Sequence, residues 1–190
     1  MYGNCCYLIM ESLNLKRTMY LTEDEIRDNA KVILGFDEKD PDVKQGTGQI
    51  TTFNQLGFKG VSDKPDGWYL PNDKQDIAII LETKSEKEDV FSEKHYAELV
   101  KNIEIAALQY KRVVGILYNG TDVRVIKYIK GSEQYEEIAD VAKTLQNKRY
   151  YIALFKENRI NKQLIYSLTK KINDCLHVQF GIKNLYHRMI

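Results

Sequence analysis

The chain has 190 residues, of which 43% are hydrophobic and 29% charged, as expected for one globular domain with a sizeable core. Its formal net charge is only +1 at pH 7. No apolar run approaches the roughly 18 residues that a membrane-spanning helix needs, so we expect no membrane partner.

Residues 1–20 show no clear periodicity, and we expect them to form an N-terminal extension. They lack the basic segment and long apolar run that define a signal peptide. Cys5 and Cys6 are adjacent and Cys175 lies far away, so no CxxC spacing is present. An odd number of cysteines without CxxC spacing is typical of reduced thiols, which predicts a cytoplasmic protein.

The first regular element is predicted to be an amphipathic helix. Thr22 and Glu25 have the spacing of a capping box, and Gly35 is a candidate C-cap. Apolar residues follow the cap at helical spacing, namely Ile26, Ala30, Ile33 and Leu34. The next stretch, 36–60, is polar and turn-rich, and we interpret it as a loop. Its Gly46-Thr47-Gly48 is not a phosphate loop, because no Gly-Lys-Ser/Thr follows.

A hairpin is predicted in the centre of the chain. The apolar run 77–81 is typical of a buried strand, and the turn-forming residues 71–76 separate it from the shorter run 67–70. Pairing the two runs about that turn places Asp66 opposite Glu82, or one position away. Glu82 and Lys84 project from the same face, because side chains alternate along a strand.

Two carboxylates at the end of a buried strand form a hard-oxygen site, which Mg²⁺ or Mn²⁺ prefers. The backbone carbonyl of Thr83 is a further candidate ligand. Lys84 on the same face can orient an attacking water, help to deprotonate it, and stabilise negative charge on a phosphorane. The competing interpretation is an exposed hairpin on which Glu82 and Lys84 simply face water.

A crossover unit is predicted after this strand. We expect a helix from Ser92 or Glu93 to Arg112, followed by a second buried strand at 113–117. A strand, a helix and a strand at these lengths predict parallel pairing and a right-handed crossover. Asn119-Gly120 then indicates a hairpin turn, which leads into an antiparallel strand through Val123, Val125 and Ile126.

The last third is predicted to be helical. We expect a helix over 132–146, and 149–156 is ambiguous between helix and strand. The spacing of Leu164, Ile165, Leu168, Ile172, Cys175 and Leu176 predicts a further helix. Residues 143–190 contain ten Lys or Arg and two acidic residues, which gives them a charge of +8. Because the whole chain carries +1, the first 142 residues carry −7. This asymmetry indicates a basic surface for nucleic acid or an acidic partner, or else a solvated helix face.

Pro65-Asp66 followed by Glu82-Thr83-Lys84, sixteen positions further on, resembles the PD-(D/E)xK nuclease motif. The resemblance is closest to the N-terminal endonuclease domain of type I restriction–modification polypeptides and of fused nuclease–methyltransferases. It implies an α/β fold, a restriction-endonuclease-like mixed β-sheet flanked by helices, over residues 21–131. Residues 132–190 would form a helical connector to downstream methyltransferase or specificity domains. The abrupt apolar end of the chain fits a fragment of a longer polypeptide.

The resemblance also implies site residues, a cofactor and a substrate. Asp66 and Glu82 would hold Mg²⁺ or Mn²⁺, Lys84 would assist the water, and double-stranded DNA would be cut. Glu25 on the leading helix is a candidate additional ligand. Relatives often carry a glutamine and a tyrosine four apart after the motif. Here Gln109 and Tyr110 are adjacent, so Gln109 is only a candidate DNA contact and Tyr110 is assigned to the core.

Two alternatives remain open at this point. One is a non-catalytic interaction module with a nuclease fold, which would use its basic tail for docking. The other is a stand-alone repair nuclease or resolvase. The three histidines, His95, His177 and His187, have neither zinc-ligand nor HNH spacing, and we assign them to structural or surface roles.

Overall fold

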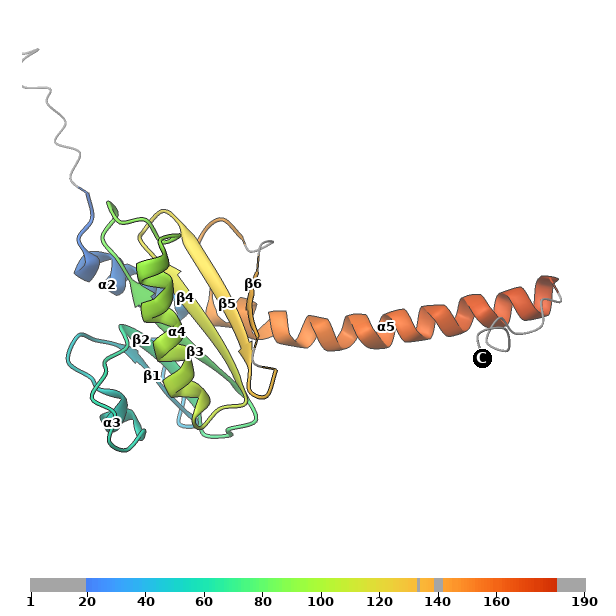
Figure 1. Ribbon diagram of the computed structural model, residues 1–190, viewed down its shortest axis with the longest axis horizontal. Coiled ribbons are helices and arrows are strands. Elements are labelled where there is room, and N and C mark those ends of the chain that lie inside the picture. Colours follow the sequence, from blue (N-terminus) through green and yellow to red (C-terminus); the bar gives the residue numbers. More distant parts are fainter. Residues whose placement is uncertain (1–19, 133, 139–141, 181–190) are drawn as a thin grey trace, which may run out of the picture.

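The computed structural model describes residues 20–132, 134–138 and 142–180. Cys5, Cys6 and nearly all of the predicted N-terminal extension lie outside the described residues, as do residues 181–190 at the end of the predicted connector. The described chain forms a mixed α/β fold around a six-stranded sheet, shown in Figure 1. In chain order the elements are α2 (Glu23–Leu34), β1 (Val43–Thr47), α3 (Phe53–Leu56), β2 (Gly67–Pro71), β3 (Ile77–Thr83), α4 (Glu93–Ala107), β4 (Arg112–Tyr118), β5 (Val123–Ile129), β6 (Tyr135–Glu137) and α5 (Lys148–Phe180).

The strands lie in the order β1-β2-β3-β4-β5-β6, so each strand pairs with its neighbours in the sequence. All neighbours are antiparallel except β3 and β4, which are parallel and joined through α4. The predicted parallel pairing of the two strands through a helix is therefore confirmed. The predicted turn at Asn119-Gly120 is also confirmed, because it joins the antiparallel pair β4 and β5.

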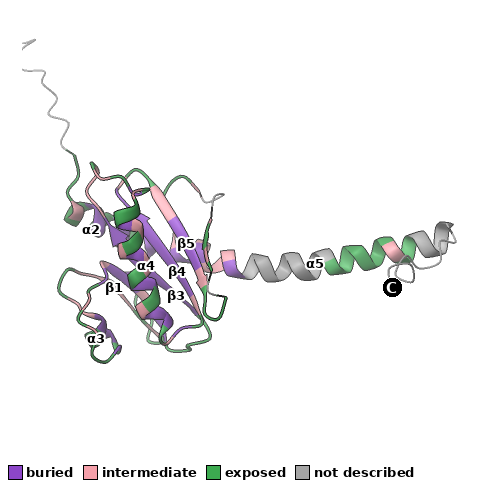
Figure 2. Cartoon of the chain, in the orientation of Figure 1, coloured by how far each residue is buried: buried purple, intermediate pink, exposed green. Residues whose placement is uncertain are grey.

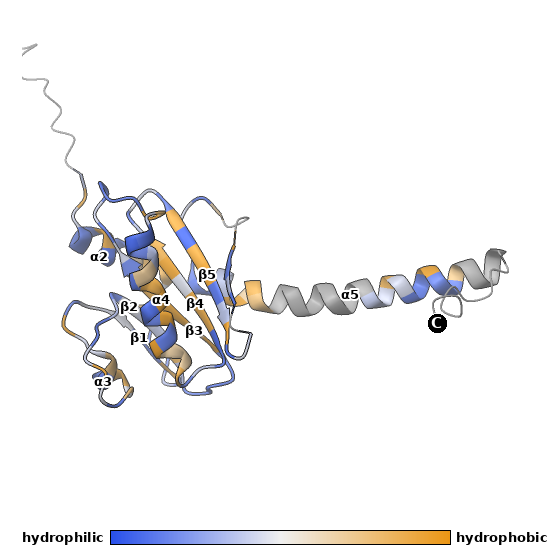
Figure 3. Ribbon diagram, in the orientation of Figure 1, coloured by the Kyte–Doolittle hydropathy of each residue, from blue (hydrophilic) through white to orange (hydrophobic). Residues whose placement is uncertain are grey.

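Helices cover both faces of the sheet. On one face α3 and α4 pack against Ala78 and Ile80 of β3. On the other face α2 and the start of α5 pack against Ile79 and Leu81 of the same strand. All seven residues of β3 are consequently buried. Figure 2 shows the strand coloured as buried, and Figure 3 shows the central strands as the most hydrophobic part of the sheet. A strand buried on both faces requires the continuous apolar run seen in the sequence.

The local predictions for α2 are confirmed. Thr22 accepts a hydrogen bond from the Glu25 amide, and the Glu25 carboxylate accepts one in return from the Thr22 amide. Gly35 ends the helix with φ of 71°, a left-handed conformation that glycine adopts without steric cost. The capping residues seen in the sequence thus mark both ends of α2.

The predicted hairpin is confirmed, and its register is now unique. Gly67 pairs with Leu81 and Trp68 with Ile80. Extending this register by one residue brings Asp66 level with Glu82, which was one of the two predicted positions. Tyr110 is buried and its hydroxyl donates to the carbonyl of Pro71 at 2.6 Å, so its assignment to the core is confirmed.

The prediction of a loop over 36–60 is wrong in two places. β1 pairs with β2 at the edge of the sheet, and α3 forms a short capped helix. β1 has the sequence VKQGT, which lacks an apolar run, so nothing in it indicates a strand. Its Gly46 lies opposite Trp68, and a Cβ there would approach the indole ring to 3.2 Å. The packing of Trp68 therefore selects this strand.

The predicted helix over 132–146 is wrong for the described residues, which form β6 and non-helical segments instead. The sequence favours a helix locally, but cross-strand contacts select a strand. The rings of Tyr135 and Tyr128 stack at 5.0 Å, and Glu137 forms an ion pair with Arg124 at 2.8 Å. The sheet thus extends beyond residue 131, into the segment expected to be a connector.

Residues Lys148–Phe180 form one long helix, so the ambiguous segment 149–156 is helical. Tyr151 and Phe155 pack into the core, while Tyr166 and Ile172 are exposed. Figure 1 shows α5 running out from the sheet. The predicted helix after Ser92 is also confirmed, but it ends at Ala107 because Arg112 already belongs to β4. Nowhere in the described part of the chain is a helix both long and apolar enough to cross a membrane.

The closest packing between α4 and the sheet predicts a specific stability effect. A Cβ at Gly115 of β4 would come within 3.0 Å of Leu99 and collide with Ile103. We expect Gly115→Ala to lower the free energy of unfolding by about 1–3 kcal/mol through overpacking. Urea unfolding measures this effect. Gly48→Ala is the control, since its Cβ meets Thr51 only at an ordinary 3.5 Å. Equal stabilities for the two variants would contradict the packing described here.

Candidate functional site

Asp66 lies immediately before β2 and is bonded to the end of β3. Its Oδ2 accepts hydrogen bonds from the amide of Thr83 at 2.7 Å and from the Thr83 hydroxyl at 3.0 Å. Its backbone carbonyl accepts a bond from the Gly48 amide at 2.9 Å. The hairpin therefore brings Asp66 to the strand that carries Glu82, as the register predicts.

Glu82 is enclosed under α4, with only 6% of its surface exposed. Asn102 of α4 donates a hydrogen bond to its Oε1. Burial, together with the negative charge of Asp66, raises the pKa of Glu82 to about 8, against the opposing effects of Lys84 and Asn102. Glu82 and Asp66 are thus close enough to interact electrostatically, and Glu82 is largely protonated at neutral pH.

Lys84 faces the same helix. Its Nζ forms an ion pair with Glu98 of α4 at 2.8 Å. Burial opposes the charged amine, but the bond to Glu98 and the charges of Glu82, Glu98 and Glu23 outweigh it, so the pKa of Lys84 is raised. The ammonium is a donor and a positive charge at this site, and its protonation disfavours a role as a base.

Glu98 connects Lys84 to a buried histidine. His95 contacts Glu98 through Nδ1 at 3.4 Å and Glu88 through Nε2 at 3.5 Å. Glu88 in turn accepts a bond from the Ser85 amide at 3.1 Å. The first turns of α4 and the segment after β3 are therefore joined by one polar network, in which His95 has the structural role expected of it.

Two residues of α2 belong to the site and were not predicted. The Arg27 guanidinium is buried and donates through Nε to Asp66 Oδ1 at 3.1 Å. It also pairs with Glu23 at 2.9 Å and Asp24 at 2.7 Å. Burial raises the pKa of Glu23, as does the charge of Asp66. The sequence did contain a signal for this pair. Glu23 lies four residues before Arg27, a spacing that makes the two side chains neighbours on a helix, and Arg27 follows the buried Ile26.

The structure brings Glu23, rather than the predicted Glu25, toward Asp66. Glu25 is exposed and its carboxylate accepts bonds from the amide and the hydroxyl of Thr22, both at 2.8 Å. These bonds lower the pKa of Glu25. Its acidic side chain is thus used to cap α2, and the capping box that revealed the helix also explains why Glu25 points elsewhere.

Gln109 lies beyond the C-terminal end of α4, whereas the polar network around Lys84 involves the first turns of that helix. Its side chain donates to the carbonyl of Gly57 at 2.8 Å. The structure therefore does not bring Gln109 together with Asp66, Glu82 and Lys84. Any contact of Gln109 with DNA would lie away from those residues.

The residues at the end of β3 fit a hard divalent cation in type: Asp66 would supply one carboxylate, and Glu82 a second once it has released its proton. Mg²⁺ typically takes one or two carboxylates and completes its shell with waters and phosphate oxygens. In the described ranges, no three His, Cys, Asp or Glu side chains are grouped so as to hold a metal ion. The amide and the hydroxyl of Thr83 donate hydrogen bonds to Asp66. The role of the Thr83 carbonyl as a metal ligand stays a prediction.

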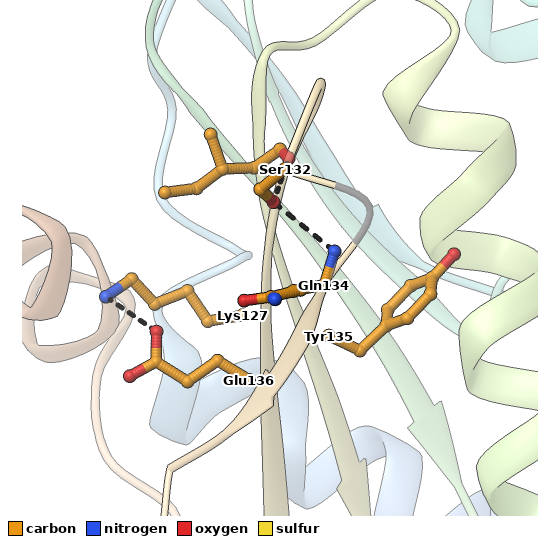
Figure 4. Close-up of a pocket in the computed structure, with 6 residues that line it drawn as sticks. Lys127, Ser132, Gln134, Tyr135 and Glu136 are labelled. Carbon is orange, nitrogen blue, oxygen red and sulfur yellow. Dashed lines mark hydrogen bonds and ion pairs between the residues drawn. The ribbon is translucent and has the colours of Figure 1, made fainter.

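Two hollows lie away from these residues. One, of about 470 Å³, is lined by Lys127, Gln134, Tyr135 and Glu136 at the β5–β6 edge (Figure 4). In this hollow the Lys127 Nζ and the Glu136 Oε2 lie 3.6 Å apart and form an ion pair. The other, of about 530 Å³, lies beside the start of α5 and includes Arg112 and Arg149. Neither contains Asp66, Glu82 or Lys84.

Comparisons with family models, with curated proteins and with solved structures find no match for this chain.

The pKa of Glu82 predicts how stability depends on pH. The folded state keeps the Glu82 proton up to about pH 8, whereas the ordinary value is 4.5. Between these values the native state binds more protons than the unfolded state, so this group lowers stability by about 1.4 kcal/mol for each unit that the pH rises. Glu82→Gln, which cannot ionise, should therefore gain stability relative to wild type from pH 5 to pH 8.

Urea unfolding at pH 5, 6.5 and 8 measures this gain. Glu93→Gln is the matched control, because it removes an exposed carboxylate from the first turn of α4 and should give a much smaller pH-dependent difference. A stability difference between Glu82→Gln and wild type that stays constant across this range would show that Glu82 ionises normally in the fold.

Proposed function

We propose that this chain is a metal-dependent nuclease domain that hydrolyses phosphodiester bonds of double-stranded DNA. The observation that carries the proposal is the convergence of Asp66, Glu82 and Lys84 at the end of a buried strand. In this proposal Asp66 and Glu82 hold Mg²⁺ or Mn²⁺, with Thr83 as a further carbonyl ligand. The bound ion would supply Lewis-acid stabilisation of the phosphate.

The ion pair of Lys84 supports a specific role within that proposal. A protonated amine cannot accept a proton from water, but it can donate hydrogen bonds and stabilise negative charge on a phosphate. Glu98 at 2.8 Å holds the ammonium in place. Lys84 thus acts by orienting the water and by electrostatic stabilisation, contributions that typically account for a 10²–10³-fold effect on rate.

Glu23 replaces Glu25 as the candidate acidic residue from the leading helix. It belongs to the first turn of α2, and the charges of Asp66 and Lys84 both act on its pKa. Its carboxylate is bonded to Arg27, so it can approach a cation at Asp66 only with Arg27 nearby. Glu23 would therefore be an outer member of the site, one that adds negative charge for the cation.

The fold is compatible with the nuclease proposal at the level of architecture. A mixed sheet with helices on both faces places the end of a central strand beside a hairpin residue. We propose a restriction-endonuclease-like fold on this basis, as the motif resemblance implies. We further propose that downstream methyltransferase or specificity domains supply recognition. The charge of −7 over the first 142 residues disfavours tight DNA binding by this part alone.

The test is cleavage of supercoiled plasmid DNA in Mg²⁺ or Mn²⁺. We expect Lys84→Ala to reduce the cleavage rate by about 10²-fold or more, because the charge beside Glu82 is lost. Lys101→Ala is the matched control, since Lys101 pairs with Asp63 on the exposed side of α4. It should cleave at the wild-type rate. Unchanged cleavage by a folded Lys84→Ala protein would refute the proposal.

A second candidate is a non-catalytic module with the same fold. The observation that favours it is that the carboxylates are already bonded, Asp66 to Arg27 and Glu82 to Asn102. Such a module would bind no divalent ion at Asp66. Calorimetric titration with Mn²⁺ separates the candidates, because a nuclease site must bind the ion and must lose it in Asp66→Asn.

A further inference from the structure

Arg27 is a buried side chain that forms ion pairs with three carboxylates at this site. Its three nitrogens each have a separate carboxylate partner: Nε bonds Asp66, Nη1 bonds Asp24, and Nη2 bonds Glu23. The guanidinium side chain is only 6% exposed. A buried cation of this kind persists only where carboxylates compensate the loss of its hydration.

The three partners of Arg27 differ in their access to solvent. Asp66 is 14% exposed, whereas Glu23 is 42% and Asp24 is 64% exposed. The bond to Asp66 therefore lies on the interior side of the guanidinium, and the other two lie toward the solvent. Loss of the Asp66 bond alone would leave Arg27 paired with Glu23 and Asp24.

The Asp66 carboxylate, by contrast, is bonded to one cation only among the described residues, which is Arg27. Its Oδ2 is bonded to the amide and hydroxyl of Thr83, and its Oδ1 accepts the bond from Arg27. The oxygen that faces Arg27 is thus the one a cation can claim without detaching Asp66 from β3. Lys84 does not provide the compensating charge for Asp66, because its ammonium pairs with Glu98.

We propose that Arg27 is the resident counter-ion of this site and that a divalent ion binds Asp66 by displacing the Arg27 Nε–H from Oδ1. The inference rests on the proposed function. The displaced guanidinium stays attached to Glu23 and Asp24, so the exchange needs only a local rotation of one side chain. The exchange lowers the apparent affinity for the ion, because only the fraction of molecules with Oδ1 released can bind it.

An alternative role for Arg27 is purely structural, since its bonds also fasten α2 to the end of β3. The two roles differ in one measurable respect. A structural arginine affects stability and leaves metal affinity unchanged or weakened. A competing counter-ion weakens metal binding, so that its removal strengthens it.

The decisive experiment is calorimetric titration of the full chain with Mn²⁺, together with its thermal unfolding in EDTA and in Mn²⁺. We expect Arg27→Met to bind Mn²⁺ at least about tenfold more tightly than wild type, because the competing cation is gone. The variant should unfold at a lower temperature in EDTA and recover more on adding Mn²⁺ than wild type does. Arg27→Lys keeps the charge but replaces the planar guanidinium, with its three separate nitrogens, by a single ammonium, so its affinity for Mn²⁺ should lie between those of wild type and Arg27→Met.

Arg124→Met is the matched control. Arg124 is similarly enclosed, with 10% of its side chain exposed, and pairs with Glu137 at 2.8 Å on the strands β5 and β6. Its removal should cost stability and leave the affinity for Mn²⁺ unchanged. An increase in affinity in this control equal to that in Arg27→Met would overturn the inference, because the effect would then be one of overall charge.

If Arg27→Met does not fold, NMR spectroscopy of the wild-type protein provides an independent test. The Arg27 Nε–H resonance, assigned by its loss in Arg27→Lys, should shift saturably during titration with diamagnetic Mg²⁺ and exchange faster with water. A resonance that stays unchanged while Mg²⁺ binds would overturn the inference.

The outcomes distinguish this inference from the proposed function. Equal Mn²⁺ affinity in wild type and a folded Arg27→Met would overturn the role of Arg27 and leave the metal site intact. Binding that survives in Asp66→Asn would place the ion elsewhere and overturn both. The absence of binding by wild type and by both Arg27 variants would likewise remove the metal site and the inference together.

Discussion

The burial of β3 on both faces is the constraint on which the rest of this structure depends. Its parallel pairing with β4 requires a crossover, and α4 provides it while covering one face. The same helix that buries Ala78 and Ile80 also presents Asn102 to Glu82 and Glu98 to Lys84. The polar surroundings of the site are therefore a consequence of how an apolar strand is covered.

Charge compensation is the second constraint, and it joins elements that are distant in the sequence. The enclosed cations Arg27 and Lys84 each have carboxylate partners on a helix or on the hairpin. Among the described residues, no buried side-chain nitrogen or oxygen lacks a hydrogen-bond partner. Since an unpaired buried charge is costly, these pairs stabilise the packing of α2 and α4 against the end of β3 as well as shaping the site. Glu82 avoids the free-energy cost of a buried charge because it keeps its proton at neutral pH.

Sequence patterns predicted the parts of the fold that depend on neighbouring residues. The capping box of α2, the turn residues of the β2–β3 hairpin and the apolar run of β3 each lie within a few positions of the structure they specify. The same holds for the relation between Asp66 and Glu82, because pairing the two strands about the turn at 71–76 places Asp66 opposite Glu82 or one position away. Once Gly67 pairs with Leu81, the carboxylates meet at the strand end.

The tertiary structure decided what depends on distant partners. The strands β1 and β6 have polar sequences, and each is selected by a neighbouring strand, through Trp68 in one case and Tyr128 in the other. Arg27 meets Asp66 across 39 positions, so the spacing on α2 could mark Glu23 and Arg27 as a pair without revealing their common partner. By itself the sequence determined which carboxylates and which lysine converge at β3. Only the folded chain decided which charges surround them, because electrostatic compensation acts between side chains that are close in space, whatever their separation along the chain.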